Sequence, residues 1–288
     1  MTPAEVRAWL ARHQLAAHRD RGQNFLVDER LADKLVGLAG VGSGDTVLEI
    51  GTGLGLLTRA LAARAKRVVS VEIDAGIVRA LRAEAALPGN VELVHADALA
   101  VDLEELLAGA PGPVRVVANL PYAAASPLLR RLLDLRGLLA DWSVMVQREM
   151  AERIAAAPGT RAYGSLAVIH AWCASVRRGL DLHPRCFHPV PRVRSRFLCL
   201  TPHPEALLAP GELGRLEPWL RGAFAHRRKT LRGALRTSAP AAADPGPLLA
   251  ELGVPERARP GELAPPAWLQ LARRLADERG EAEPSFAR

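Results

Sequence analysis

Short apolar runs alternate with stretches of helical spacing along the first half of the chain. The runs are rich in β-branched residues and predict strands at residues 46–50, 68–71, 91–94, 114–117 and 142–146. Between them, apolar residues recur every three or four positions, as at Leu57 and Leu61. Short strands that alternate with helices are typical of a parallel sheet covered on both faces. We therefore predict an α/β fold.

The pattern changes after the break at Pro158 and Gly159. A helix is expected at 166–174, and strands at 175–183 and 196–200 would extend the sheet as a hairpin. From Pro202 onward, Pro and Gly separate about four short helical segments. We predict a first domain at 1–200 and a small all-helical domain at 201–288, with a frayed tail from residue 281.

Composition narrows the class of protein. The chain is 49% hydrophobic and 24% charged, which is ordinary for a soluble globular protein. We find neither an apolar run approaching the ~18 residues of a membrane span nor a signal-peptide pattern at the N-terminus. The three cysteines, Cys173, Cys186 and Cys199, suit neither a disulfide framework nor a zinc site. We expect a cytoplasmic protein, by default a monomer, with no bound metal and no membrane partner.

The net charge of +7 is unevenly distributed. Residues 41–135 hold nine Lys/Arg against eleven Asp/Glu, a balance of −2, whereas residues 177–236 hold thirteen against four, a balance of +9. A strongly basic later segment favours a polyanionic partner such as RNA. A membrane surface is less favoured, because no Lys-rich amphipathic helix with bulky aromatics is found. A merely solvated basic face stays open as an alternative.

Acidic and glycine residues gather where the first three strands end. Residues 49–55 (EIGTGLG) follow the first strand, Glu72 ends the second and Asp97 ends the third. Parallel strands deliver such residues to one ligand crevice, where Gly51 and Gly53 would permit a sharp turn and close approach of a ligand. Glu72 suits ribose hydroxyls, and Asp97 suits an adenine amino group. NAD is an alternative ligand, but Glu49 would repel a pyrophosphate and suits a cationic sulfonium ligand better.

The segment after the fourth strand, residues 119–122 (NLPY), carries the most specific chemistry. An enzyme that methylates an exocyclic amine must turn the nitrogen lone pair out of the base. The Asn119 side-chain oxygen and a carbonyl near Leu120 or Pro121 can accept both amine hydrogens, while Tyr122 stacks on an extruded base. A plain Asn-x-Pro turn with a packed tyrosine is the alternative.

Two basic clusters are candidates for RNA contact. Residues 224–232 (FAHRRKTLR) predict a helix with Arg221, Arg228 and Arg232 on one side. Residues 187–196 place Phe187 in a Pro-rich loop beside Arg192 and Arg194, which favours base stacking flanked by phosphate contacts. The alternative for Phe187 is a core residue beneath an exposed loop.

Several of these motifs, taken together, resemble one family. They are residues 21–28 (RGQNFLVD), 49–55, 119–122, 146–154 (VQREMAERI), 187–191 (FHPVP) and 227–231 (RRKTL). In this order they resemble the ribosomal RNA adenine dimethyltransferases, above all the bacterial small-subunit KsgA/RsmA branch, over residues ~18 to ~275.

The resemblance implies a class I, Rossmann-like methyltransferase domain with a mostly parallel seven-stranded sheet. It implies dimethylation at N6 of two adjacent adenines near the 3′ end of 16S rRNA, using S-adenosylmethionine, within a late small-subunit assembly intermediate. By position, Asn24, Leu26, Gly51, Glu72, Asp97 and Asn119 match the donor-binding residues, and Gly53 of the glycine loop is a further expected donor contact. Tyr122 and Phe187 match the base-stacking aromatics, and Arg192, Arg194, Arg221, Arg227, Arg228, Lys229 and Arg232 are the expected RNA contacts.

The sequence departs from the family's usual residues at some positions, and other functions stay open as alternatives. Thr52 stands where the family usually has proline, and Arg194 stands where an acid is typical. Ala123, Ala124 and Ala125 are expected to leave room for the first methyl group. The alternatives are an RNA-binding assembly factor with little catalysis, a large-subunit rRNA methyltransferase, and a methyltransferase for proteins or small molecules. A dehydrogenase is a distant further candidate.

Overall fold

The structure is a computed structural model that describes residues 1–17, 22–110, 114–205, 207–240 and 243–278. The predicted tail from residue 281 and Arg21 of the first motif lie outside the described residues. The chain forms two compact units. We call Met1–Ala151 with Arg177–Pro202 the sheet unit, and Glu152–Val176 with His203–Arg288 the helical unit. Residues 152–176, assigned by sequence to the first domain, therefore lie in the helical unit. The functions assigned to the predicted domains stay predictions.

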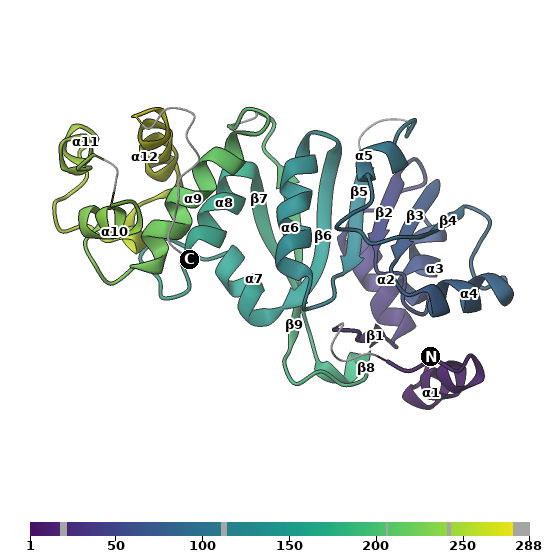
Figure 1. Cartoon of the computed structure of the whole chain (residues 1–288). Coiled ribbons are helices and arrows are strands. Elements are labelled where there is room, and N and C mark those ends of the chain that lie inside the picture. The colour runs from purple at the N-terminus through teal and green to yellow at the C-terminus, as the bar shows by residue number, and fades with distance from the viewer. Residues whose placement is uncertain (18–21, 111–113, 206, 241–242, 279–288) are drawn as a thin grey trace. The chain divides into compact units, whose positions relative to one another are not determined.

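In the described part of the chain, the main sheet has seven strands in the order β4-β3-β2-β5-β6-β9-β7. The strands are β2 (Thr46–Ile50), β3 (Arg67–Glu72), β4 (Val91–His95), β5 (Val114–Asn119), β6 (Leu139–Gln147), β7 (Ala174–Leu182) and β9 (Ser195–Pro202). The strands β4, β3, β2, β5 and β6 are parallel to one another, whereas β9 runs antiparallel to β6. A mostly parallel seven-stranded sheet was predicted and is confirmed. The two late strands extend it, with β9 lying between β6 and β7 (Figure 1).

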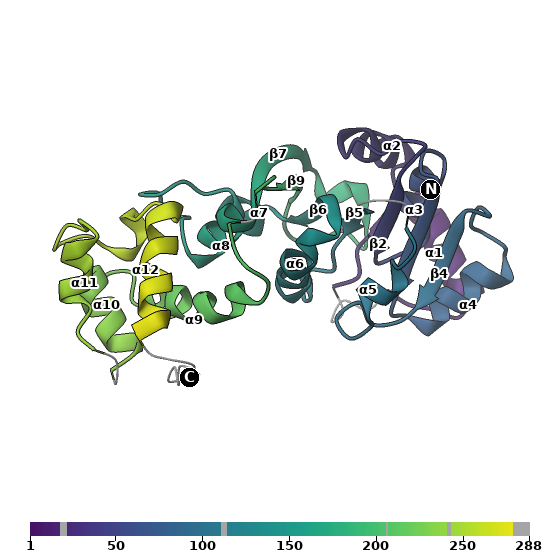
Figure 2. The same cartoon turned by 90° about the horizontal axis from the view of Figure 1, so that it is seen from above.

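Helices cover both faces of this sheet. Those of the sheet unit are α1 (Pro3–Arg12), α2 (Glu29–Leu38), α3 (Leu56–Ala62), α4 (Ala75–Ala83), α5 (Leu103–Leu106), α6 (Ala125–Asp134), η2 (Leu135–Gly137) and η3 (Pro184–Cys186). Figure 2 shows α2 and α6 on opposite sides of the sheet. Leu35 of α2 and Leu61 of α3 pack against Val47 and Val117 in a buried cluster. The central strand β2 is buried along its whole length, including the polar residues Thr46 and Glu49, because both faces of the sheet are covered.

A second ladder and a second cluster hold the N-terminal segment. The short strands β1 (Phe25–Leu26) and β8 (Phe187–His188) pair antiparallel. Val6 and Leu10 of α1 pack with Phe25 and Ile77 in a separate buried cluster. The helix begins at a capping box in which Thr2 and Glu5 bond each other's backbone N–H.

The helical unit contains four α-helices among the described residues after His203, as predicted. The helices of this unit are α8 (Ser165–Cys173), α9 (Glu212–Ala225), α10 (Leu231–Ser238), α11 (Gly246–Glu251), η4 (Pro260–Glu262) and α12 (Pro265–Glu278), while α7 (Arg148–Ile154) crosses the boundary. Its aromatic core contains Phe224, whose ring centroid lies 5.5 Å from that of Trp268 and 5.9 Å from that of Tyr163. The Tyr163 hydroxyl donates to the Leu263 carbonyl at 2.8 Å.

The prediction of one basic helix through residues 224–232 is wrong. Helix α9 ends at Ala225, and α10 begins only after Thr230. The Thr230 hydroxyl accepts the Gly233 N–H at 3.3 Å, so Thr230 is the N-cap of a new helix. Arg228 therefore lies in the turn between two helices, and the predicted side shared by Arg221, Arg228 and Arg232 does not exist.

Candidate active site

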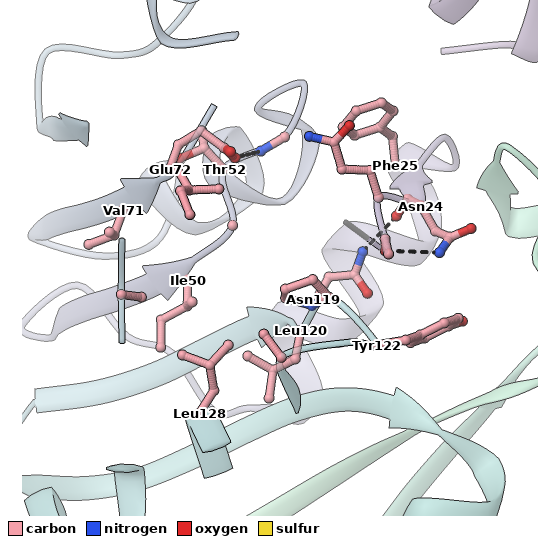
Figure 3. A pocket seen from close by; sticks show the side chains of 18 of the residues that line it. Asn24, Phe25, Ile50, Thr52, Val71, Glu72, Asn119, Leu120, Tyr122 and Leu128 are labelled. Atoms are coloured by element: carbon pink, nitrogen blue, oxygen red, sulfur yellow. Dashed lines mark hydrogen bonds between the residues drawn. The ribbon is translucent and has the colours of Figure 1, made fainter. Parts of the chain in front are cut away.

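A pocket of about 420 Å³ lies at the carboxyl ends of the parallel strands. Its walls come from residues 22–26, from the loop after β2, and from the ends of β3, β4 and β5 with the first residues that follow them. Figure 3 shows side chains from these segments pointing into one space. The predicted residues that line it are Asn24, Leu26, Gly51, Gly53, Glu72, Asp97, Asn119, Leu120, Pro121 and Tyr122. The topology therefore brings the strand-end residues together, as the parallel pattern predicted.

The glycine loop after β2 requires its glycines. Gly51, Gly53 and Gly55 have φ of +86°, +54° and +76°, a region that disfavours other residues. A Cβ added to Gly53 would lie 3.0 Å from Cδ1 of Phe25, which itself lines the pocket. The loop thus combines a left-handed turn with close approach of the N-terminal segment.

Glu49 does not face the pocket, and the expectation that it meets a cationic ligand directly is wrong. Its side chain is fully buried beneath the glycine loop. One carboxylate oxygen, Oε2, accepts hydrogen bonds from Thr58 Oγ1 and Ser70 Oγ, each at 2.6 Å. Burial raises the pKa of Glu49 to about 8, against the opposing effect of the two hydroxyl groups. The Glu49 side chain points to the side of β2 where Thr58 of α3 lies, whereas the next residue, Ile50, lines the pocket.

Glu72 and Asp97 do reach the pocket, in different environments. Glu72 is nearly buried, and its Oε2 and Oε1 accept the N–H groups of Gly53 and Asp74, each at 2.9 Å. Burial raises the pKa of Glu72, and the backbone hydrogen bonds oppose that rise. Asp97 is exposed, and its Oδ1 accepts the Leu99 N–H at 2.8 Å. Both carboxylates are therefore oriented by local backbone at the ends of adjacent strands.

Asn119 is held in one orientation at the end of β5. Its Nδ2 donates to the backbone carbonyl of Asn24 at 2.9 Å, as Figure 3 shows. Only the amide nitrogen can donate to a carbonyl, so this bond assigns Oδ1 to the other side of the amide. Asn24 is in turn held by its own Nδ2, which donates to the Gly22 carbonyl at 3.0 Å. The arrangement leaves an acceptor oxygen on Asn119 within the pocket.

Tyr122 lies three residues after Asn119, in the loop that follows β5. Its hydroxyl and Ser195 Oγ, at the start of β9, are 2.7 Å apart. Burial raises the pKa of Tyr122. Gly22 passes so close to this loop that an added Cβ would lie 2.9 Å from the Tyr122 nitrogen. The ring is thus held at both its backbone and its hydroxyl, half-buried at the pocket wall.

Phe187 is not brought to the pocket. It lies in β8, opposite Leu26, with 1% of its surface exposed and within the buried cluster that includes Leu35 and Phe197. In this structure it has the core position that the sequence left open as an alternative. Its role as a base-stacking residue stays a prediction.

Residues that sequence reasoning missed also line the pocket. Ile73 and Leu99 do so as exposed large apolar residues, with 53% and 40% of their surface accessible. They follow Glu72 and Asp97 by one and two positions, so apolar residues directly after strand-end acids were the available signal. Phe25 and Leu54 add a buried apolar wall.

The family model described as ribosomal RNA adenine dimethylase matches residues 14–277 of this chain. The chain belongs to that family. Ribosomal RNA small subunit methyltransferase A of Magnetococcus marinus is 39% identical over 267 residues, covering 93% of this chain and 95% of the relative. The protein of the same name from Methylobacterium radiotolerans is 42% identical over 285 residues, covering 97% and 95%.

Two solved structures share the dimethylase fold. A dimethyladenosine transferase from Plasmodium falciparum has a TM-score of 0.75 and 25% identity, covering 88% of this chain and 98% of that one. The 23S rRNA methyltransferase ErmE has a TM-score of 0.64 and 29% identity, covering 88% and 99%. The comparisons confirm the predicted resemblance, the Rossmann-like methyltransferase fold and the enzyme class, a ribosomal RNA adenine dimethyltransferase.

The basic residues of this dimethylase are less available than the sequence suggested. Residues 219–236 contain no Asp or Glu, and we call them the acid-free stretch. Two of their arginines nevertheless pair with acids on either side of it: Arg221 with Glu217 at 2.7 Å, and Arg232 with Asp244. Arg227 donates to the Arg161 carbonyl, and Lys229 donates to Thr237 Oγ1. Arg228 is exposed in the turn. In the sheet unit, Arg192 and Arg194 are exposed in the loop before β9.

Three further findings bear on the chemistry. Ala123 and Ala124 line the pocket, whereas Ala125 is buried at the start of α6 outside it. Among the described residues, no cluster of three or more His, Cys, Asp or Glu side chains could hold a metal ion. The helices of the described ranges include none that is long and apolar enough to cross a membrane.

Proposed function

We propose that this chain transfers methyl groups from S-adenosylmethionine to N6 of two adjacent adenines in a hairpin loop near the 3′ end of 16S rRNA. The reaction would take place in the cytoplasm, on a late assembly intermediate of the small ribosomal subunit, with the chain acting as a monomer. Relatives near 40% identity named as small-subunit methyltransferases support this substrate. The observation that carries the proposal is the Asn119 amide, fixed by Asn24 beside Tyr122 in the pocket.

The donor would occupy the side of the pocket formed by β2, β3 and β4. Glu72 would accept ribose hydroxyls, and Asp97 would accept the adenine amino group, with Ile73 and Leu99 on the faces of the base. Gly51 and Gly53 would admit the methionine part, and Asn24 and Leu26 would close over it. When bound, S-adenosylmethionine supplies an electrophilic methyl group on a sulfonium. The apolar wall of Phe25 and Leu54 would exclude water from the reacting groups.

The target adenine would occupy the side formed by residues 119–122. Asn119 Oδ1 accepts one N6 hydrogen. The Pro121 carbonyl already accepts the Ala124 N–H at 3.0 Å, so we assign the second hydrogen to the Leu120 carbonyl. Accepting both hydrogens turns the nitrogen lone pair toward the donor, and Tyr122 stacks on the base. Acceleration then comes mainly from positioning and from these fixed acceptors.

The RNA backbone would contact basic residues of both units. Arg192 and Arg194 of the sheet unit and Arg228 of the helical unit would supply phosphate contacts. Arg227 and Lys229 would add to them with the N–H groups that their bonds to the Arg161 carbonyl and Thr237 Oγ1 leave over. Arg221 and Arg232 contribute less, because each is already paired with a carboxylate.

Mass spectrometry of rRNA from cells with and without this gene tests the proposal. We expect N6,N6-dimethyladenosine in 16S rRNA only when the gene is present. Complementation with Asn119→Ala should lower the yield at least ~100-fold, since a fixed transition-state acceptor is lost. RNA binding should persist.

Asn90→Ala is a matched control for that experiment. Asn90 also donates to backbone carbonyls of the sheet unit, those of Ala62 and Ala65, but does not line the pocket. We expect this variant to keep its methylation yield. Full turnover in Asn119→Ala contradicts the mechanism. Dimethyladenosine in 23S rRNA instead of 16S rRNA would identify a large-subunit enzyme, and gene-dependent assembly without any dimethyladenosine would identify an assembly factor.

A further inference from the structure

A chain of buried hydroxyl groups connects the glycine loop to Glu49. Thr52, the second residue of the loop, has its Oγ1 2.6 Å from Ser70 Oγ of β3. Ser70 donates to Glu49 Oε2 at 2.6 Å, and Thr58 of α3 donates to the same oxygen at 2.6 Å. All four side chains are buried. The register of the sheet creates this chain, because Glu49 of β2 and Ser70 of β3 are directly paired.

The direction of these hydrogen bonds follows from counting protons. A serine hydroxyl has one proton, and that of Ser70 is donated to Glu49. Thr52 must therefore donate its own proton to Ser70. The hydroxyl proton of Thr52 is thus committed to Ser70, although the residue also lines the pocket. Successive bonds in such a chain strengthen one another.

Burial raises the pKa of Glu49 to about 8. The other carboxyl oxygen, Oε1, has no hydrogen-bond partner in the described structure. Oε2 alone accepts the hydrogen bonds of both hydroxyl groups. Glu49 is therefore the buried end of the chain, and hydrogen bonds through Ser70 and Thr52 link it to the glycine loop.

Thr52 occupies the part of the loop with the greatest backbone freedom. It lies between Gly51 and Gly53, which both adopt left-handed φ and which both line the pocket. Backbone hydrogen bonds hold these neighbours: Gly51 N–H to the Val71 carbonyl, and Gly53 N–H to Glu72. Ordering two glycines costs more conformational entropy than ordering other residues. A side-chain anchor between them offsets part of that cost.

We propose that Thr52 is a positioning residue for the methyl donor, held by its hydrogen bond to Ser70 and, through Ser70, to Glu49. It keeps Gly51 and Gly53 in the conformation that receives the ligand. This inference rests on the proposed function, because it assumes that S-adenosylmethionine binds in this pocket. It also assigns a role to a threonine at a position where the family usually has proline.

Donor binding by Thr52→Val and Thr52→Ser tests the proposal. Valine keeps the shape of threonine without its hydroxyl, and serine keeps the hydroxyl. Calorimetric titration with S-adenosylmethionine should show roughly tenfold weaker binding for Thr52→Val, as expected for one net hydrogen bond. Thr52→Ser should remain within about twofold of wild type. In turnover assays, Thr52→Val should raise the KM for the donor about as much and leave kcat and the KM for RNA unchanged.

Thr46→Val is the matched control. Thr46 is another buried threonine and belongs to β2, and its Oγ1 has no hydrogen-bond partner in the described structure. This variant should bind the donor like wild type. Ser70→Ala breaks the chain from the other side and should weaken donor binding in the same direction as Thr52→Val. Thermal unfolding of each variant shows that the folded protein is being titrated.

The outcomes separate this inference from the proposed function. If wild type does not bind S-adenosylmethionine, the proposed function fails. If wild type binds it and Thr52→Val binds within twofold of wild type, only the positioning role is overturned. An equal loss in Thr46→Val would also overturn it, because the effect would then reflect general packing of β2. A loss in Thr52→Val that Thr52→Ser does not rescue would assign the effect to shape instead of the hydroxyl.

Discussion

The strand-end acids of the sheet unit and the arginines Arg232 and Arg273 of the helical unit are held in different ways. In the sheet unit, Glu72 and Asp97 each accept the backbone N–H of the residue two positions later. Glu72 also accepts the N–H of Gly53, in the loop after the neighbouring strand β2. In the helical unit, Arg232 is held by Asp244 and Arg273 by Glu212, partners 12 and 61 residues away. Strand ends therefore reveal a functional role by local position, whereas the charge of a helical segment does not reveal which cations stay available to RNA.

Buried titratable groups sharpen this comparison, and the largest expected effect concerns stability. His170 of α8 is buried, its Nδ1 bonds the Leu166 carbonyl at 2.7 Å, and burial lowers its pKa to about 4. The unfolded chain takes up this proton near pH 6.5, before the folded chain does. Stability from this residue is therefore complete above pH 6.5 and is lost as pH falls toward 4.

We expect His170 to cost about 2 kcal/mol of the free energy of unfolding between pH 7 and pH 5. His170→Leu should lack this loss, which urea unfolding at the two pH values measures. Parallel pH dependence in wild type and His170→Leu would contradict the buried neutral state. The contribution of Glu49 in the sheet unit changes with pH in the opposite direction, since its raised pKa makes stability fall as pH rises toward about 8.

Tyr122 tests the pocket of the sheet unit. Tyr122→Ala should lower kcat/KM roughly 30-fold, because the stacking of the base on an aromatic ring, worth about 2 kcal/mol, is lost. Tyr122→Phe keeps the ring and loses only the hydrogen bond to Ser195, so it should retain activity within several-fold. Single-turnover assays on an RNA hairpin distinguish the two. Equal losses in both variants would show that the hydroxyl, and not the ring face, matters.

The basic turn of the helical unit gives the smallest expected effect. Arg228→Ala should reduce the slope of log affinity against log salt by about 1, whereas Arg232→Ala should change it less because Asp244 already pairs with Arg232. Asp244→Ala should release Arg232 and strengthen RNA binding slightly. Filter binding at several salt concentrations measures all three. Indistinguishable slopes for Arg228→Ala and Arg232→Ala would remove the distinction between paired and exposed cations.

Much of the candidate site was predictable because it depends on strand order and glycine geometry. Parallel strands place their carboxyl ends together, so Gly51, Glu72, Asp97 and Asn119 meet without further information. Glu49 was misplaced, because its side chain, two positions before Gly51, points to buried hydroxyl groups and not to the ligand. The orientation of a single side chain depends on which neighbours, here Thr58 and Ser70, can satisfy it.

The prediction of a single basic helix was wrong because of a local signal. The prediction that its charges are available was wrong because of a partner far along the chain. Thr230 is a helix N-cap, a signal that was present in the sequence but was outweighed by helical periodicity. The ion pair of Arg232 with Asp244 could not be read from the acid-free stretch 219–236, because Asp244 lies beyond it.

By itself, the amino-acid sequence determined the α/β fold, the left-handed glycine loop and the family, because these depend on periodicity and on residues with few allowed roles. Tertiary structure decided which polar atoms remain available: Oδ1 of Asn119 once Asn24 holds its Nδ2, and Thr52 as an inward donor once Ser70 is committed to Glu49. The physical reason is that each hydrogen-bond donor has few protons, so its partner in space, and not its place in the chain, fixes what it offers a ligand.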